Sequence, residues 1–200
     1  MLPNSKSIYT DWHKTFPGSG QGKQYPYLLD KILTHNREQR RHTRGVSKPW
    51  HTILDYGCGK GGTALWLHTL IKKQPLEIDL YDPGHPTYKD TPLRDSYDLV
   101  YSCDVLEHIE PEDIHGVIEH TQRLAKHNIH IIDMTQAKKR LPDGRNAHVL
   151  LQDKYEWIKT FEQHAHTIEE VFAYSIPDPN FTTRDRVCIW TRALKDYTKR

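Results

Sequence analysis

The sequence has no long apolar run and few cysteines. No stretch approaches the roughly 20 apolar residues that cross a bilayer, and the chain begins with MLPNSKSIYTDW, which lacks the apolar core of a signal peptide. The three cysteines, Cys58, Cys103 and Cys188, are odd in number and far apart, a pattern typical of reduced thiols. These absences predict a cytoplasmic protein with no membrane partner and no disulfide framework.

The chain also has little excess charge. Its 28 Lys and Arg residues against 26 Asp and Glu residues give a net charge of +2, whereas nucleic-acid-binding domains usually concentrate basic charge on one face. A nucleic-acid partner therefore stays open but is not favoured. Histidine pairs such as His127/His130 and His164/His166 have no cysteine or HExxH partner, so we expect surface or structural roles for them and no metal site.

The stretch that organises the chain is HTILDYGCGKGGT, residues 51–63. A short apolar run ends in Asp55, and a helix-like apolar pattern follows the glycines at Gly57, Gly59, Gly61 and Gly62. Strand, glycine turn and helix in this order form the opening unit of an α/β nucleotide-binding sheet. The glycines permit positive φ angles and let a ligand lie against the backbone N–H groups at the helix start.

Asp55 indicates which ligand this turn would bind. A carboxylate just before the first glycine would repel a pyrophosphate but would favour a ligand that carries positive charge, such as S-adenosylmethionine with its ammonium and sulfonium groups. The segment LDYGCGKG resembles motif I of the class I S-adenosylmethionine-dependent methyltransferases. The resemblance implies that this cofactor contacts Asp55 and the turn residues Gly57, Cys58, Gly59 and Gly61. A glycine turn without a ligand is the alternative.

The second strand is expected over Leu76–Asp82, because Pro83 and Gly84 interrupt its alternating pattern. In the methyltransferase family an acidic residue at this point binds the ribose hydroxyls. The resemblance assigns that role to Asp82, with Pro83 beside it, while Asp79 lies mid-strand and fits the role less well.

The chain then departs from the family pattern. Only a short polar stretch separates Asp82 from the next strand-like run, which is too little chain for a complete βαβ crossover. We therefore expect the third strand of the family to be missing, together with the acidic motif that reads adenine there. Tyr88 or residues near Leu93 are expected to cover the adenine instead.

The run YDLVYSCDVLEHI, residues 97–109, reads as a buried strand that ends at Ser102, Cys103 and Asp104. Ligands of open α/β sheets bind outside the carboxyl ends of the strands, so these three residues should line the junction of cofactor and acceptor, with Asp104 also a catalytic candidate. The run resembles the V-L-E-H segment of small-molecule O- and C-methyltransferases and lacks the D/N-P-P-Y/F box of DNA amino-methylating enzymes. His108 is either a general base or a loop-holding residue bonded to a backbone carbonyl.

The segment LPDGRNAH, residues 141–148, resembles a signature of phage-type methyltransferase-like proteins. Its side chains can fork onto an anion, donate and accept hydrogen bonds, and exchange a proton. We therefore predict substrate contacts from Asp143, Arg145, Asn146 and His148, with His148 as the preferred catalytic base. An ordinary surface turn is the alternative.

The predicted fold is α/β: a Rossmann-like class I methyltransferase sheet, mostly parallel with an antiparallel C-terminal strand, and shortened around strand three. Residues 1–50 form an N-terminal arm and helix, in which Tyr9, Trp12 and His13 cover the pocket or pack on the core. Residues 51–200 form the S-adenosylmethionine-binding domain, closed by a hairpin from residues 168–175 and 186–191.

The predicted function is S-adenosylmethionine-dependent methyl transfer to an unidentified acceptor, with a small molecule favoured over a DNA base amine. The alternatives are cleavage of the cofactor and a non-catalytic binding module on the same fold. The expected compartment is the cytoplasm, which is the host cytoplasm if the protein is phage-encoded.

Overall fold

The computed structural model describes residues 21–41, 49–72, 75–164, 166–177 and 183–193. The expected N-terminal lid lies outside these residues. The helices are α2 (Pro26–Arg41), α3 (Gly62–Leu70), the short 3-10 helix η1 (Leu106–His108), α4 (Ile114–Leu124) and α5 (Lys154–Glu162). The strands are β1 (Thr52–Tyr56), β2 (Glu77–Tyr81), β3 (Tyr97–Cys103), β4 (Ala125–Asp133), β5 (His166–Pro177) and β6 (Thr183–Ala193).

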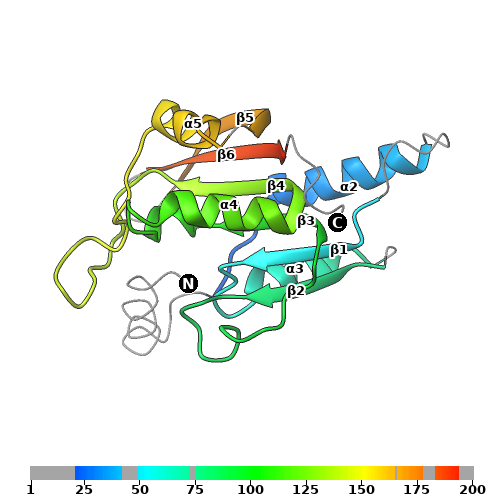
Figure 1. The fold of residues 1–200 in the computed structure, drawn as a ribbon, viewed down its shortest axis with the longest axis horizontal. Coiled ribbons are helices and arrows are strands. Elements are labelled where there is room, and N and C mark those ends of the chain that lie inside the picture. Colours follow the sequence, from blue (N-terminus) through cyan, green and yellow to red (C-terminus); the bar gives the residue numbers. More distant parts are fainter. Residues whose placement is uncertain (1–20, 42–48, 73–74, 165, 178–182, 194–200) are drawn as a thin grey trace.

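The described strands form one six-stranded sheet in the order β2-β1-β3-β4-β6-β5 (Figure 1). β1 pairs in parallel with β2 and β3, and β3 pairs in parallel with β4. β6 runs antiparallel to both β4 and β5, which confirms the mostly parallel sheet with an antiparallel C-terminal strand. The part of the chain between β2 and β3 forms turns and no strand, which confirms the shortening around strand three.

Helices cover both faces of the sheet. Ile53 and Leu99 pack in a core with residues of α2 and α3, whereas Leu54 and Val100 pack in a second core with residues of α4 and α5. Successive residues of a strand point to opposite faces, so strands buried on both faces read as continuous apolar runs. The helix α2, which precedes the first strand, therefore packs directly on the sheet through the first of these two cores. No described helix has the length and apolar character that a bilayer span requires.

Each of the four parallel strands has an aspartate at or next to its carboxyl end. Asp55 lies at the end of β1 and Asp133 at the end of β4, while Asp82 follows β2 and Asp104 follows β3. Because the carboxyl ends of parallel strands meet at one edge of the sheet, the fold gathers four carboxyl groups there.

Candidate functional site

A cavity of about 930 Å³ opens at this edge of the sheet. It contains most of the residues that the sequence predicts for a cofactor and a base. The predicted residues that line it are Asp55, Gly57, Cys58, Gly59, Asp82, Pro83, Cys103, Asp104, His108 and His148.

The glycine turn forms one wall of the cavity. The N–H groups of Gly57 and Cys58 donate to the carbonyl of Tyr81, at 2.7 and 3.1 Å. Gly57 has a φ of 77°, and a Cβ on it would come within 2.6 Å of the Val105 side chain, so glycine is required here. Gly61, at the start of α3, has a φ of 76° and is buried beneath the turn, outside the residues that line the cavity.

Asp55 is a buried carboxyl group at the floor of the cavity. The residue is 3% exposed, and its Oδ2 has no hydrogen-bond partner. Burial raises its pKa to about 7; the adjacent Tyr101 hydroxyl opposes this shift and the negative charge of Asp82 adds to it. A buried, unpaired carboxylate oxygen is costly unless a cation or donor meets it, so this atom is suited to a positively charged ligand.

Asp82 holds the glycine turn from the neighbouring strand. Its Oδ2 accepts from the N–H of Gly59 at 2.8 Å, and its Oδ1 accepts from the N–H groups of Gly84 and His85, at 2.8 and 3.1 Å. Asp79, the weaker candidate for ribose binding, forms bonds to Arg94 and Tyr97 instead and does not line the cavity.

Asp104 has an unusual backbone: its φ of 54° is the one positive value among the described non-glycine residues. Arg186 donates to both of its carboxylate oxygens, at 3.0 and 2.9 Å, and Lys23 forms an ion pair with it. Burial alone would raise the pKa of Asp104, but Lys23 and Arg186 outweigh it and the pKa is lowered. A carboxylate with a lowered pKa is a weak base, so the geometry suits positioning better than proton abstraction.

Arg186 and Asp133 were not identified from the sequence. Both are buried, at 2% and 1% exposure, and Arg186 joins Asp104 to Asp133, with a 3.4 Å contact to the latter. Arg184 also pairs with Asp133, at 2.7 Å. The signal that could have identified Asp133 is its position at the end of a buried strand, which it shares with Asp55.

The two cavity thiols remain protonated. Burial raises the pKa of Cys58 and of Cys103, and the charge of Asp55 raises both further. Ser102 does not line the cavity: it is fully buried, and its Oγ lies 2.8 Å from Nδ1 of His130 on the face covered by α5. Because the thiols of Cys58 and Cys103 stay protonated, they offer the cavity an apolar contact surface and do not act as nucleophiles.

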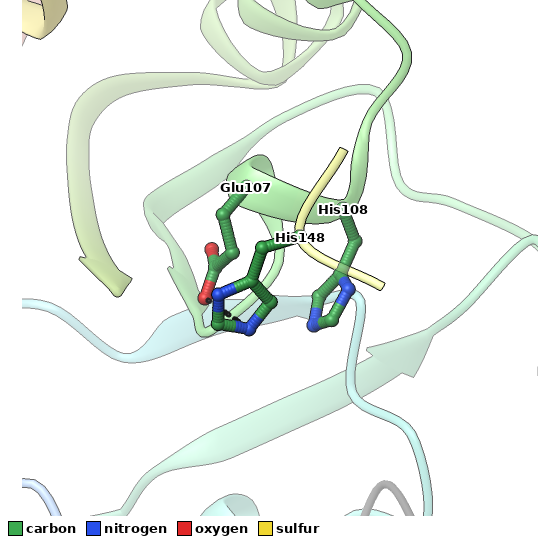
Figure 2. Close-up of side chains that lie close together, drawn as sticks. All are labelled: Glu107, His108 and His148. Atoms are coloured by element: carbon green, nitrogen blue, oxygen red, sulfur yellow. Dashed lines mark ion pairs between the residues drawn. The ribbon is translucent and has the colours of Figure 1, made fainter. Parts of the chain in front are cut away.

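His108 and His148 both line the cavity and lie side by side, with Glu107 next to His148 (Figure 2). The Nδ1 of His108 donates to the carbonyl of Ala147 at 2.7 Å, and the Nδ1 of His148 donates to the carbonyl of Thr135. Burial lowers the pKa of His108 to about 4 and also lowers the pKa of His148. Both rings are therefore neutral at pH 7. The bond from His108 to a backbone carbonyl agrees with the second of its two predicted roles, that of a residue that holds the loop.

The predicted substrate residues of the LPDGRNAH segment bond mainly within the chain. Arg145 donates to both carboxylate oxygens of Glu110, at 2.8 and 2.9 Å, and also pairs with Asp143. Asn146 exchanges two hydrogen bonds with the backbone of Ala137. None of Asp143, Arg145 and Asn146 lines the cavity. Their bonds shape the loop that holds His148 in the cavity wall.

The helix α4 forms a further part of the cavity wall, and the residues expected to cover adenine do not. Gly116, Val117 and His120 line the cavity there. Tyr88 instead stacks on His85, and Leu93 packs against the core, so neither lines the cavity.

Taken together, the cavity is lined by a glycine turn, by buried carboxyl groups and by two neutral imidazoles. Such a site can bind a ligand with a cationic group and hold a second molecule against it in a partly closed space.

The sequence comparisons identify one family. Residues 22–173 match the model of a family described as "Methyltransferase domain", which is more than half of the chain. No curated protein matches the sequence significantly.

Solved structures share the fold at low identity. The magnesium protoporphyrin IX methyltransferase from Synechocystis PCC 6803, solved with bound S-adenosylmethionine, aligns at a TM-score of 0.55 and 16% identity, over 95% of this chain and 98% of that chain. The 1,6-didemethyltoxoflavin N1-methyltransferase from Burkholderia thailandensis aligns at a TM-score of 0.61 and 11% identity, over 98% of this chain and 91% of that chain. At such identities the likeness is one of fold.

Proposed function

Because this chain belongs to the methyltransferase-domain family, we propose that its cavity binds S-adenosylmethionine beside a small-molecule acceptor. Methyl transfer with S-adenosylmethionine as the donor follows from the family, and the small-molecule acceptor is our further proposal. The observation that carries the cofactor position is the buried Asp55, which lines the cavity and whose Oδ2 has no hydrogen-bond partner; such a group matches a cationic ligand.

Three observations favour a small acceptor. The cavity volume of about 930 Å³ falls within the range of small-ligand sites, about 300–1,000 Å³. Two proteins of the same fold are named for small-molecule acceptors, a magnesium porphyrin and a toxoflavin precursor. The sequence also lacks the D/N-P-P-Y/F box of DNA amino-methylating enzymes.

The chemistry asked of the protein is mainly positional. The sulfonium methyl is already electrophilic, so the site must align the acceptor with the methyl–sulfur bond and exclude water. In our proposal Asp55 binds the positive charge of the cofactor, Asp82 binds the ribose hydroxyls, and the neutral His148 faces the acceptor.

The test is a calorimetric titration with S-adenosylmethionine and S-adenosylhomocysteine, followed by a labelled-methyl assay on fractionated acceptors. We expect both ligands to bind and label to enter a small-molecule fraction, with S-adenosylhomocysteine as the product. Label in DNA would contradict the acceptor class. Methylthioadenosine as the product would indicate cofactor cleavage, and binding without turnover on any fraction would favour a non-catalytic module.

The affinity for S-adenosylmethionine should depend on pH through Asp55. Its pKa of about 7 means that the carboxyl group is protonated below that pH, so affinity should fall about tenfold per pH unit below 7. Titrations between pH 5.5 and 7.5 measure this slope. The Asp55→Asn variant should show a flat profile, and an equally steep profile in that variant would assign the slope to another group.

Asp82→Ala should weaken cofactor binding by about 30- to 100-fold, because it removes a buried charged acceptor from the ribose site and from the N–H of Gly59. Calorimetry with S-adenosylhomocysteine measures the loss. Asp79→Ala removes a carboxylate from β2, the strand that Asp82 follows, and outside the cavity; it should leave the affinity within about twofold. Unchanged binding in Asp82→Ala would remove Asp82 from the cofactor site.

A further inference from the structure

Glu107, His108 and His148 form a compact cluster (Figure 2). One potential ligand atom from each residue lies within 4.8 Å of those of the other two. The two imidazole rings stand edge to face with their centroids 4.7 Å apart, and Nε2 of His148 lies 4.0 Å from Oε1 of Glu107. Both histidines line the cavity, so the cluster lies next to its open space.

Both imidazole rings are held in one tautomer. A backbone carbonyl only accepts, so the Nδ1 atoms that meet the carbonyls of Ala147 and Thr135 must carry the protons. In a neutral ring the lone pair is then at Nε2. A histidine that ligates a metal through Nε2 commonly donates its Nδ1 proton to a carbonyl in this way, which fixes the ring orientation.

The carboxyl group of Glu107 is incompletely satisfied. It is fully buried; its Oε1 accepts from the N–H of Asp133 at 3.2 Å, while its Oε2 has no hydrogen-bond partner. Arg184 and Arg186 pair with aspartates, and no described lysine or arginine forms an ion pair with Glu107. The contact of Glu107 with Nε2 of His148, at 4.0 Å (Figure 2), is an ion pair only when that imidazole carries a second proton. A buried carboxylate in this state needs a positive charge or a proton.

We propose that Glu107, His108 and His148 bind a divalent transition-metal ion. Two imidazole nitrogens and one carboxylate oxygen suit ions such as Zn²⁺, Fe²⁺ and Mn²⁺. Metal–nitrogen bonds of about 2.0–2.1 Å place the ligand atoms about 3.3 Å from one another. Side-chain rotations that move these atoms by about 1 Å would bring all three within bonding distance of one ion. Three protein ligands leave a coordination position open toward the cavity.

Such an ion would also define the acceptor. This step rests on the proposed methyl transfer, whereas the metal site itself does not. A hydroxyl oxygen of the acceptor would occupy the open position, and the ion would lower its pKa so that the proton leaves to water. The oxygen then bonds to the methyl carbon while the carbon–sulfur bond breaks, which yields a methyl ether and S-adenosylhomocysteine.

The test is metal binding by the whole chain, expressed without a polyhistidine tag and freed of metal with a chelator. We expect Co²⁺ to bind in a single equivalent with the visible absorption of a ligand set containing nitrogen, and Zn²⁺ to displace it. Glu107→Gln and His148→Asn should each lower the Co²⁺ affinity about 100-fold or more, since each removes a ligand. Wild-type protein that binds no Co²⁺ would overturn the proposal.

The matched control is His115→Gln. His115 and His164 have ring nitrogens 2.8 Å apart, outside the cavity, and are the competing place for an adventitious ion. Loss of Co²⁺ in this variant, with retention in His148→Asn, would assign the ion to that surface pair and overturn the proposal. Anomalous scattering from wild-type crystals soaked in Co²⁺ locates the ion even if the cluster variants do not fold.

The outcomes separate the metal site from the methyl-transfer function. Co²⁺ bound at the cluster without any binding of S-adenosylmethionine would leave the metal site and contradict the cofactor position. Binding of S-adenosylmethionine to a chain that takes up no Co²⁺ would support the cofactor position and overturn the metal site. Co²⁺-stimulated methylation of a hydroxyl acceptor, lost in His148→Asn, is the result expected if both hold.

Discussion

Asp55→Asn should lower the affinity for S-adenosylmethionine about 100-fold or more. The substitution keeps the shape of the side chain but removes the negative charge of a buried group that lines the cavity, and loss of one partner from a buried charge pair costs about 2–5 kcal/mol. Calorimetric titration at pH 7.5 measures the change. Asp79→Asn, on the adjacent strand and outside the cavity, is the matched control and should bind as the wild type does.

The same substitution should stabilise the ligand-free protein. Burial raises the pKa of Asp55 to about 7, so between about pH 4 and 7 the folded state keeps a proton that the unfolded chain has lost. The free energy of unfolding therefore falls as pH rises through this window, by up to about 4 kcal/mol.

Asparagine has no such proton linkage but buries an amide, so we expect a net gain of about 2 kcal/mol at pH 7, or about 4–8 °C in Tm. Thermal unfolding of wild type and variant without ligand checks this value. A variant that loses both affinity and Tm would indicate a structural role for Asp55 and would remove the support for a cationic ligand. Weak binding with a raised Tm is the combination that a charge-binding residue predicts.

Arg186→Met should destabilise the fold by about 3 kcal/mol, equivalent to about 6–12 °C in Tm. Arg186 is buried and forms ion pairs with Asp104 and Asp133, and removal of one member of a buried ion cluster leaves uncompensated charge. Differential scanning calorimetry at pH 7.5 measures the loss.

The matched control is Arg192→Met, on the same strand. Arg192 is 47% exposed in its side chain and pairs with Glu169, so its loss should cost less than about 1 kcal/mol. The double variant Asp104→Asn/Arg186→Met should regain part of the stability, because one of the two carboxylates that lose Arg186 as a partner is gone. Equal losses in Arg186→Met and Arg192→Met would contradict the account of Arg186 as a buried charge partner.

Local sequence pattern was sufficient to predict the strands whose carboxyl ends border the cavity. The strands predicted before the glycine turn and from Tyr97 onward are present as β1 and β3, because parallel strands buried on both faces give continuous apolar runs. The short polar stretch after Asp82 was enough to predict the missing strand, since a crossover needs more chain than is present.

Local pattern could not decide which way side chains point. Ser102 and Cys103 are neighbours on a strand with two buried faces, so no polar face marks the side toward the ligand. Only the packing shows that Cys103 lines the cavity and that Ser102 bonds to His130 on the other face. The hydrogen-bonding groups of Arg145 and Asn146 looked available in the sequence, but Glu110 and Ala137 bind them.

The sequence by itself determined the fold, the glycine turn and the aspartates beside it, because these depend on backbone periodicity and on residues close together in the chain. The tertiary structure alone decided which distant groups meet. Arg186 reaches Asp104 and Asp133 across the sheet, and His148 is carried to Glu107 and His108 by a loop. Those contacts join segments far apart in sequence, and no local spacing encodes them.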